Sequence, residues 1–436
     1  MISIRKASAA FGALALAAFL ADPALAAPPA INSGDTAWML TSSLLVLMMI
    51  VPGLALFYGG LARTKNMLSV MTQIGAVAAL TMLVWVGWGY SMAFGDGGNH
   101  VIANFGKMFL HGVTTTSVNT LAGTIPEYVY VCFQMTFAAI TVALVLGSVV
   151  ERMKFSAVMV FGLVWLTIVY FPIAHMVWSA DGHFAILGAL DYAGGTVVHI
   201  NSGVSALVAC LILGKRLGYP KEPMPPHSLT MTGIGTGLLW VGWFGFNAGS
   251  AVAANANAGL AMINTFVATA AAGLAWMLCE RLAGNKGSAL GFCSGIVAGL
   301  VAVTPAAGNS GPLGAIVLGA VAAGICYLAV TVMKPRLGYD DALDTFGVHG
   351  IGGMVGALGT GIVNDAMFGG PANGGKTIAA QMVVQLETVA ATIVWAAIGP
   401  VIAITIAKFV TGLRVSEQVE REGLDLGEHG ERAYNM

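Results

Sequence analysis

The sequence predicts an all-α polytopic membrane protein with eleven transmembrane helices. Of its 436 residues, 57% are apolar and only 9% are charged, and the mean hydropathy is +0.82. A soluble domain carries about 25% charged residues, so this composition excludes a soluble globular protein. The 58 glycines allow apolar helices to approach one another closely in lipid, which favours a tightly packed helical bundle.

The N-terminus has the pattern of a secretory signal peptide. Arg5 and Lys6 precede an apolar stretch at residues 7–20, and the small-residue cleavage pattern A-L-A follows at 24–26. This apolar stretch is shorter than the ~20 residues that span a bilayer, so a cleaved signal peptide at 1–26 is favoured over a first transmembrane helix. The mature N-terminus is then expected outside.

Eleven apolar segments near or above the spanning length follow in order. They are residues 38–61, 70–94, 127–149, 155–178, 196–214, 230–248, 258–279, 288–304, 312–333, 345–363 and 379–407. The last segment corresponds to about 44 Å of helix, which exceeds the bilayer's hydrocarbon core and predicts a strong tilt.

The distribution of Lys and Arg predicts the orientation. Fifteen of them lie in alternate loops, beginning after the first span, and in the C-terminal segment, whereas only Lys107 and Lys376 lie in the intervening loops. Positive residues concentrate on the cytoplasmic side, so we expect a cytoplasmic (inner) membrane protein with its C-terminus in the cytoplasm. A net charge of −1 and the absence of a basic block exclude nucleic acid as a partner.

A short motif, D-x7-H-x3-G, occurs at the starts of spans five and ten. It is formed by Asp191, His199 and Gly203, and again by Asp341, His349 and Gly353. Because spans five apart cross the membrane in opposite directions, the motif predicts a five-plus-five inverted repeat with span eleven as an extra C-terminal helix. The eleven-span domain is placed at 27–411, with repeat halves at about 36–214 and 230–363, and a cytoplasmic tail at 412–436.

Equivalent positions of an inverted repeat meet near the bilayer midplane, so His199 and His349 are expected to form a central pair. A lone intramembrane histidine often serves only as a hydrogen-bonding contact between helices. The paired placement favours a proton relay or hydrogen-bonding positions for a small polar solute, since neutral imidazole both donates and accepts. No carboxylate or thiolate stands at a ligand spacing and the five cysteines fall in apolar runs, so we assign no metal and no cofactor.

Residues near the outer ends of the spans suit a small cation. Asp191 precedes the helix that carries His199, where a structural cap is favoured over contact with substrate. Trp178 ends span four, and its position alone favours a membrane anchor. Residues 243–250 place aromatic rings, an amide and a hydroxyl at the end of span six, a mixture that attracts small cations.

Span eleven contains three polar residues. They are Gln381, Gln385 and Glu387. We expect them to be buried and to make polar contacts between helices rather than to serve a function.

At the histidine motifs and the aromatic stretch of span six, the chain resembles the ammonium transporter (Amt/Mep/Rh) family, and the bacterial Amt branch most closely. Four stretches carry the resemblance: DYAGGTVVHINSG at 191–203, WVGWFGFNAGS at 240–250, LDTFGVHG at 343–350 and GLRV at 412–415. Together with the eleven-span plan, they extend the resemblance over essentially the whole mature chain.

The resemblance implies a transporter rather than an enzyme, a homotrimer with one pore in each subunit that carries ammonium or ammonia, with methylammonium as an analogue. It implies an outer ammonium site at Trp178, Phe137 and Ser250 with structural support from Asp191, a gate formed by the stacked rings of Phe137 and Phe246, and a lumen lined by His199, His349, Leu144, Leu239 and Trp243. Thr345 departs from the valine of some members, so the inner end of the lumen is expected to be slightly more polar.

The resemblance also bears on regulation. Many bacterial members are closed from the cytoplasm by a trimeric PII signalling protein, and the matching tail makes such a partner an expectation here. An ammonium sensor would need an output domain, and the roughly 25 residues after Thr411 are too few to form one.

Overall fold

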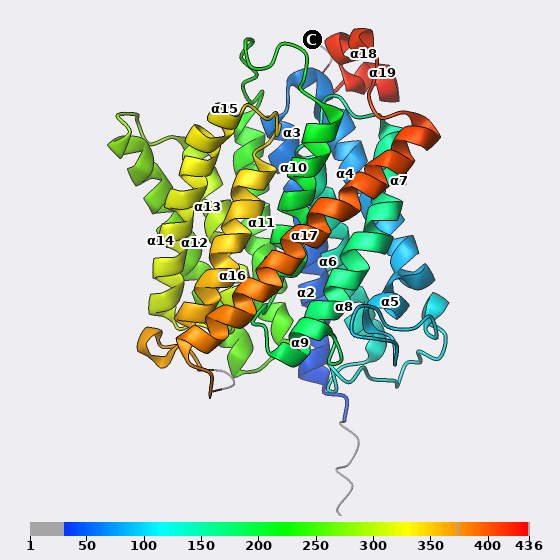
Figure 1. Cartoon of the computed structure of the whole chain (residues 1–436), viewed down its shortest axis with the longest axis vertical. Helices are drawn as coiled ribbons and strands as arrows, with labels where there is room; N and C mark the ends of the chain where they lie inside the picture. The colour runs from blue at the N-terminus through cyan, green and yellow to red at the C-terminus, as the bar shows by residue number, and fades with distance from the viewer. Residues whose placement is uncertain (1–29, 373–374, 435–436) are drawn as a thin grey trace, which may run out of the picture.

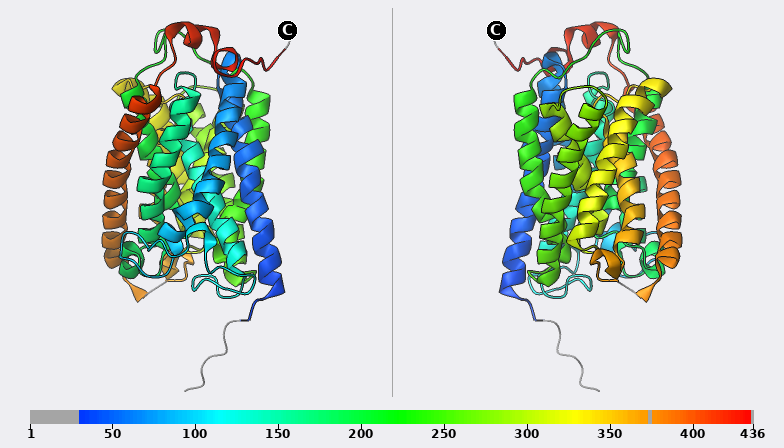
Figure 2. Two further views of the ribbon diagram at one scale, coloured as in Figure 1. Left: turned by 90° about the vertical axis from the view of Figure 1, so that its right-hand side faces the viewer. Right: turned by 90° about the vertical axis from the view of Figure 1, so that its left-hand side faces the viewer.

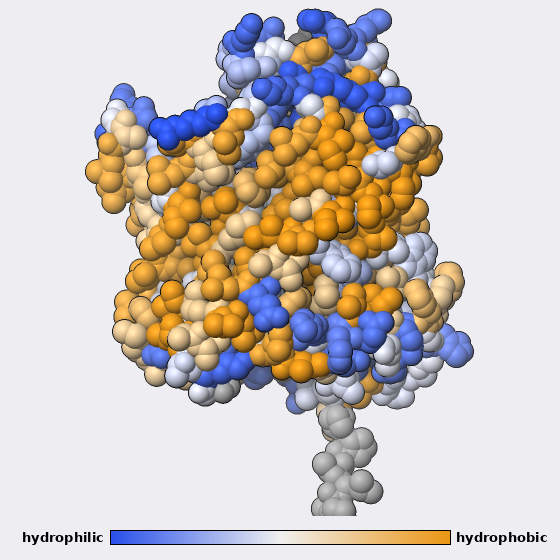
Figure 3. Space-filling view, in the orientation of Figure 1, coloured by the Kyte–Doolittle hydropathy of each residue, from blue (hydrophilic) through white to orange (hydrophobic). Residues whose placement is uncertain are grey.

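The computed structural model describes residues 30–372 and 375–434. Within these ranges eleven helical spans are long and apolar enough to cross a membrane, which confirms the predicted number. The expected signal peptide, residues 1–26, lies outside the described residues. At the surface, an apolar belt runs between two hydrophilic ends (Figure 3).

The spans are built from α-helices that are interrupted by short π-helical and 3-10 turns, labelled η. The first five spans comprise α2 (Ser33–Met48), η1 (Met49–Leu54) and α3 (Ala55–Leu61); η2 (Thr64–Asn66), α4 (Met67–Val84), η3 (Trp85–Gly89) and α5 (Tyr90–Phe94); α6 (Glu127–Leu146); α7 (Phe155–Trp165), η5 (Leu166–Tyr170), α8 (Phe171–Trp178) and α9 (His183–Leu187); and η6 (Gly195–Ile200) with α10 (Asn201–Leu213).

The remaining spans follow the same plan. They comprise α11 (Leu229–Asn247) and η7 (Ala248–Ala251); α12 (Ala256–Leu282); α13 (Ala289–Val303) and η8 (Thr304–Ala306); α14 (Pro312–Leu328), η9 (Ala329–Met333) and α15 (Lys334–Leu337); η10 (Phe346–Gly350) and α16 (Ile351–Val363); and α17 (Ile378–Thr411). The turns η4 (Met108–Leu110) and η11 (Ala366–Phe368) lie in loops, and α18 (Glu417–Glu422) and α19 (Leu424–His429) form the tail.

Polar side chains fix where five of the spans begin. An Asn, Ser or Thr at the N-cap accepts a backbone N–H of the first helical turn that would otherwise be unpaired. These caps are Asn32, Ser228, Asn255, Ser288 and Thr377. The caps therefore define the starts of these helices more sharply than the apolar runs do.

The last span, α17, crosses the bundle diagonally (Figure 1). Its 34 residues correspond to about 51 Å, well beyond the ~30 Å hydrocarbon core, so a tilt is required. α17 packs on α7 and α10, and the side views place it on the flank opposite α2 (Figure 2). Gln381 and Gln385 are buried as predicted. The predicted burial of Glu387 is wrong: its side chain is 52% exposed because it lies on the outward face of α17, although its Oε1 lies 3.8 Å from Nε2 of His183 on α9, a polar contact between helices.

The two copies of the repeated motif meet inside the bundle. Spans five and ten each begin with a π-helical turn, η6 and η10, and these two turns contact each other. A Cβ added at Gly203 would lie 2.1 Å from the backbone nitrogen of Gly350. Reciprocally, a Cβ at Gly353 would lie 3.0 Å from the Cβ of His199. The two glycines therefore allow the spans to cross closely enough to bring the two histidines together.

The tail lies at the end of the bundle opposite the start of α2 (Figure 1). Asp425 accepts the backbone N–H groups of Leu68 and Ser69 at the start of α4, at 3.1 and 2.7 Å. Glu428 accepts the N–H of Phe155, which begins α7, at 2.8 Å. Acidic side chains are favourable at helix N-termini, so these contacts hold α19 against the membrane-spanning bundle.

Candidate functional site

Three aromatic rings form a cluster at one end of a path through the bundle. Phe137 on α6 and Phe246 on α11 stack with their ring centroids 4.1 Å apart and an interplanar angle of 21°. Trp178, at the end of α8, meets Phe137 edge-on at 5.6 Å. Both phenylalanines are fully buried, whereas Trp178 is partly exposed. The stacked pair therefore closes the path, and Trp178 lies on its outer side.

Two polar residues adjoin this aromatic cluster. The Trp178 indole N–H donates to the backbone oxygen of Asp191 at 2.8 Å, which fixes the ring. The Ser250 hydroxyl donates to the backbone oxygen of Phe246 at 2.8 Å. A hydroxyl that donates in this way keeps lone pairs with which it can accept a hydrogen bond from a cation. The structure thus places Trp178 against Phe137 and Ser250 against Phe246, the two rings of the stacked pair.

The Asp191 carboxylate supports the start of η6. It accepts backbone N–H groups from Gly194, Gly195, Thr196 and Val197, and also the Thr196 hydroxyl. Burial raises the pKa of Asp191, although these hydrogen bonds act in the opposite direction. Asp191 as a residue is 7% exposed and both of its carboxylate oxygens accept backbone N–H groups, which is the geometry of a structural cap.

Asp341 caps the equivalent turn of the second repeat. Its carboxylate accepts the N–H of Phe346, the first residue of η10, at 2.7 Å. Burial raises the pKa of Asp341 to about 6, although Lys334 lowers it. The same device therefore positions His199 in η6 and His349 in η10.

The two histidines lie side by side in the interior. Their Nδ1 atoms are 3.3 Å apart and their ring centroids are 5.4 Å apart. Trp243 stacks on His199 at 5.5 Å, and its indole N–H donates to the Thr304 hydroxyl at 2.9 Å. Both imidazoles are at least 96% buried. A buried pair with one close nitrogen–nitrogen contact requires that one ring donate and the other accept.

A narrow cavity runs past this pair. Its volume is about 10 Å³, about the volume that one water-sized molecule needs. It is lined by Met49, Leu54, Phe57, Ile140, Leu144, His199, Leu239, Trp243, Phe246, Val297 and His349. The structure therefore brings together His199, His349, Leu144, Leu239 and Trp243. Phe246 is also among the lining residues and was expected as part of the gate. Sequence reasoning missed Met49, Leu54, Phe57, Ile140 and Val297, because nothing distinguishes them from other apolar residues of a span.

A wider vestibule of about 420 Å³ opens on the other side of His349. Lys334 and Asp344 form an ion pair at 2.6 Å among its walls, which sequence reasoning also missed, although Asp344 falls in the 343–350 stretch. The Tyr58 hydroxyl donates to the backbone oxygen of Leu144 at 3.1 Å and lies 3.4 Å from the Thr345 hydroxyl. The extra polarity of Thr345 is thus directed at Tyr58.

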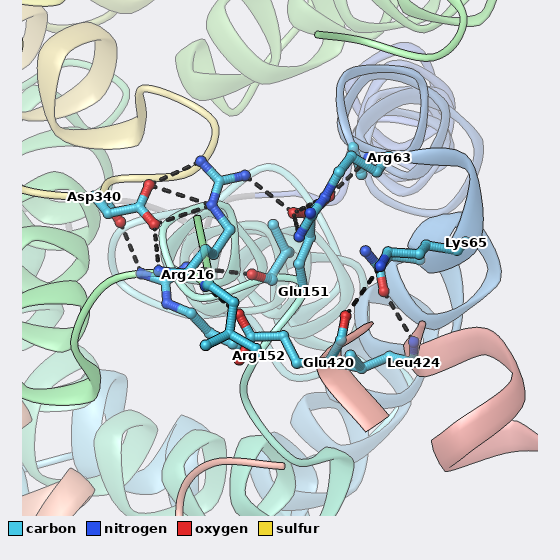
Figure 4. Close-up of polar contacts among 12 residues, drawn as sticks. Arg63, Lys65, Glu151, Arg152, Arg216, Asp340, Glu420 and Leu424 are labelled. Atoms are coloured by element: carbon cyan, nitrogen blue, oxygen red, sulfur yellow. Dashed lines mark hydrogen bonds and ion pairs between the residues drawn. The ribbon is translucent and has the colours of Figure 1, made fainter. Parts of the chain in front are cut away.

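A network of buried ion pairs braces the rim of this vestibule (Figure 4). Arg216 contacts Asp340 at 2.8 Å and Glu151 at 3.1 Å, and Arg63 contacts Glu151 at 2.8 Å. Burial alone would raise the pKa of Glu151, but Arg216 and Arg63 hold it below its usual value. The network joins loops from both repeats, so it fixes the mouth of the path on the side of the tail.

Together, an aromatic closure, a lumen sized for one small molecule and a polar vestibule define a multi-pass membrane transport protein with its own pore. The profile of the Ammonium Transporter Family matches residues 37–434. The chain belongs to this family.

The chain aligns over nearly its whole length with proteins that are named ammonium transporters. It is 48% identical to an ammonium transporter of Aquifex aeolicus, over 95% of this chain and 96% of that one. It is 43% identical to an ammonium transporter of Bacillus subtilis, over 92% and 98% of the two chains. The crystal structure of Saccharomyces cerevisiae Mep2 superimposes with a TM-score of 0.81 at 37% identity, over 88% and 90%. A structure described as a sensor Amt protein gives a TM-score of 0.83 at 27% identity, over 91% and 98%.

Proposed function

We propose that this ammonium transporter takes up ammonium at Trp178 and Ser250, that the ammonium gives its proton to solvent water on the Trp178 side of the stacked rings of Phe137 and Phe246, and that neutral ammonia passes His199 and His349. The observation that carries the proposal is the volume of about 10 Å³ for the cavity at the histidine pair. Such a lumen admits ammonia one molecule at a time and has no room for a hydrated ion.

The apolar lining supports deprotonation as the basis of selectivity. NH4⁺ and K⁺ are similar in size, so pore diameter alone separates them poorly. A charge in an apolar, water-poor lumen is costly, and the cost disfavours the charged form of any ionisable group. Ammonium can lose its proton and pass as ammonia, whereas K⁺ has no proton to lose. His199 and His349 offer both a donor and an acceptor to the neutral molecule.

The outer site gathers the cation before this step. The Trp178 ring face attracts a cation, and the Ser250 oxygen can accept its N–H. Asp191 supports the site through the hydrogen bond that its backbone oxygen accepts from Trp178.

The orientation, cellular membrane and assembly form part of the proposal. The concentration of Lys and Arg on the side of the tail supports a cytoplasmic C-terminus and an outer mature N-terminus, in the cytoplasmic membrane. A homotrimer with one pore in each subunit, and a cytoplasmic PII protein as partner, rest on the family resemblance.

The test is uptake of radiolabelled methylammonium by cells that lack their own ammonium transporters. Wild-type protein should support accumulation, and His199→Ala and His349→Ala should each change flux or selectivity over K⁺ about tenfold, the effect of roughly one lost hydrogen bond. Wild-type flux and selectivity in both variants would make the pair structural. No accumulation with well-expressed wild-type protein would favour ammonium sensing instead.

A further inference from the structure

The outward face of α17 carries an ionisable side chain that transport does not explain. Glu387 is the one acidic residue of this helix, and its Oε1 lies 3.8 Å from Nε2 of His183 on α9. The two side chains are 52% and 49% exposed. A hydrophilic spot interrupts the apolar surface along the course of α17 (Figure 3). Ionisable groups that face a bilayer are costly, so a polar ligand is expected beside this pair.

The surroundings of Glu387 indicate its depth. It lies nine residues after the start of α17, about 14 Å along the helix axis. Gln385, half a turn earlier, donates to the backbone oxygen of Leu190, and Gln381 donates to that of Gly188. The backbone at residues 188–190 is not helical, and irregular backbone of this kind does not face the hydrocarbon region. Glu387 therefore lies near the headgroup boundary, in the leaflet on the side opposite the tail.

An apolar groove continues from Glu387 towards the middle of the membrane. We call it the α17 groove; its volume is about 740 Å³, and its walls are Ile168, Ala390, Ala391, Val394, Trp395, Ile398, Gly399 and Ile402. Glu387, Ala390, Val394 and Ile398 follow one another at spacings of three or four residues, so they share one face of the helix.

The length and chemistry of the α17 groove match one acyl chain. The distance from Ala390 to Ile402 is about 18 Å along the helix, close to the ~15 Å thickness of one hydrocarbon leaflet. The residues that line the groove include the small Ala390, Ala391 and Gly399 together with the bulkier Val394 and Ile398. Glu387 and His183 supply polar groups at one end, and the α17 groove continues from them as an apolar surface. This arrangement matches a phospholipid, which has a polar headgroup and an apolar acyl chain.

We propose that this face binds a phospholipid whose headgroup carries a primary ammonium, such as phosphatidylethanolamine. The ammonium donates to the Glu387 carboxylate, the phosphate lies beside His183, and one acyl chain occupies the α17 groove. A primary ammonium forms charge-assisted hydrogen bonds with a carboxylate. The quaternary ammonium of phosphatidylcholine has no N–H, and the headgroup of phosphatidylglycerol has no cation. The proposal depends on the membrane location of α17 and not on conduction through the pore.

The test is native mass spectrometry of the purified full-length protein, titrated with phosphatidylethanolamine, phosphatidylcholine and phosphatidylglycerol of identical acyl chains. Wild-type protein should bind phosphatidylethanolamine about tenfold more tightly than the other two, the effect of one charge-assisted hydrogen bond. Glu387→Gln should remove this preference and leave the affinity for phosphatidylglycerol intact. Equal affinities in wild-type protein, or an unchanged preference in Glu387→Gln, would overturn the proposal.

A second variant tests the acyl chain separately. Ala391→Trp should fill the α17 groove and weaken binding of all three lipids severalfold. Leu386→Trp is the matched control, because Leu386 is 52% exposed on α17 but does not line the groove. Unchanged lipid binding in Ala391→Trp overturns the proposal. If that variant instead changes only the oligomeric state, the groove is an interface between copies of the chain.

Discussion

At the scale of single residues, Trp178 shows how contacts decide between two roles. Its position at the end of a span is typical of a membrane anchor. In the structure its N–H is donated to Asp191 and its edge meets Phe137. An anchor needs neither contact, so the geometry supports the cation site that the family resemblance implies.

Replacing Trp178 should therefore weaken recruitment of the cation. Trp178→Leu removes a cation–π attraction of about 0.5–2 kcal/mol, which corresponds to a 2- to 30-fold higher KM for methylammonium uptake. Trp88→Leu is the control, because Trp88 is also partly buried and donates its N–H to Thr167, away from the aromatic cluster. An unchanged KM in Trp178→Leu would return this residue to the role of anchor.

Individual residues also show what the sequence can and cannot predict. The repeated D-x7-H-x3-G spacing was enough to place His199 beside His349, because equivalent positions of an inverted repeat converge. The same sequence placed Glu387 in the interior, because an unbroken apolar run does not reveal which face of a helix is covered. The ion pair of Lys334 and Asp344 is set by a contact between the end of span nine and the loop that precedes span ten, which no local pattern encodes.

At the scale of elements, the crossing of η6 with η10 is what creates the lumen. The number and order of the spans follow from apolar length alone, and all eleven were predicted. The π-helical turns within these spans were not predicted, because the hydrophobicity of a segment does not show which backbone carbonyl each N–H bonds. The glycines of the repeated motif have a role that only the structure explains: Gly203 lies against the backbone of η10, whereas Gly353 lies against the side chain of His199 and the backbone of η6.

This difference predicts unequal effects of adding one methyl group. Gly203→Ala places a Cβ 2.1 Å from a backbone nitrogen that cannot move aside, so it should lower the unfolding midpoint and abolish uptake. Overpacking typically lowers the free energy of unfolding by about 1–3 kcal/mol, and we expect Gly203→Ala, with its closer contact, at or above the upper end of this range. Gly353→Ala, with its nearest atoms at 3.0 Å, should be milder.

Gly233→Ala serves as the control for these two variants. Gly233 lies inside α11 and has no atom within 4 Å of an added Cβ, so the change should be neutral or slightly stabilising. Thermal unfolding in detergent and methylammonium uptake measure all three variants. Wild-type stability and uptake in Gly203→Ala would show that the crossing tolerates a wider separation.

At the scale of the whole molecule, the tail joins parts of the chain that are distant in sequence. Glu420 is buried and accepts the N–H of Leu217 at 2.7 Å while it pairs with Arg414 at 2.7 Å. Lys65 donates to the backbone oxygens of Glu420 and Arg421 (Figure 4). These contacts connect the tail to the loops beside the vestibule. Displacement of the tail should therefore change the structure of the mouth of the path on that side.

Glu420→Ala should therefore release the tail and reduce both transport and association with the PII protein that we propose as a partner. The loss of a buried carboxylate removes the acceptor of the Arg414 Nε and Nη2 groups and of the Leu217 N–H, at a cost of about 1–3 kcal/mol. Protease sensitivity of the tail, methylammonium uptake and PII binding measure the effect. Glu417→Ala, at an exposed position of the same helix, is the control and should change none of them.

Deleting residues 413–436 should reproduce the loss without preventing membrane insertion, because the spans and most of the cytoplasmic charge remain. Full uptake together with unchanged PII affinity in the deleted protein would show that the tail is a passive end.

The 3.3 Å contact between the Nδ1 atoms of His199 and His349 has a consequence for the direction of the lumen. A neutral pair shares one N–H across this contact, so the ring that donates it has a bare Nε2, and the ring that accepts it carries its own single proton on Nε2. One histidine then presents an acceptor to the path and the other a donor. If the shared proton moves across to the accepting ring, that ring loses its Nε2 proton to the lumen, the former donor takes up a proton on its bare Nε2, and the two ends exchange roles. Two inverted halves thus hold a polarity that a pair of protons can reverse without any movement of the backbone.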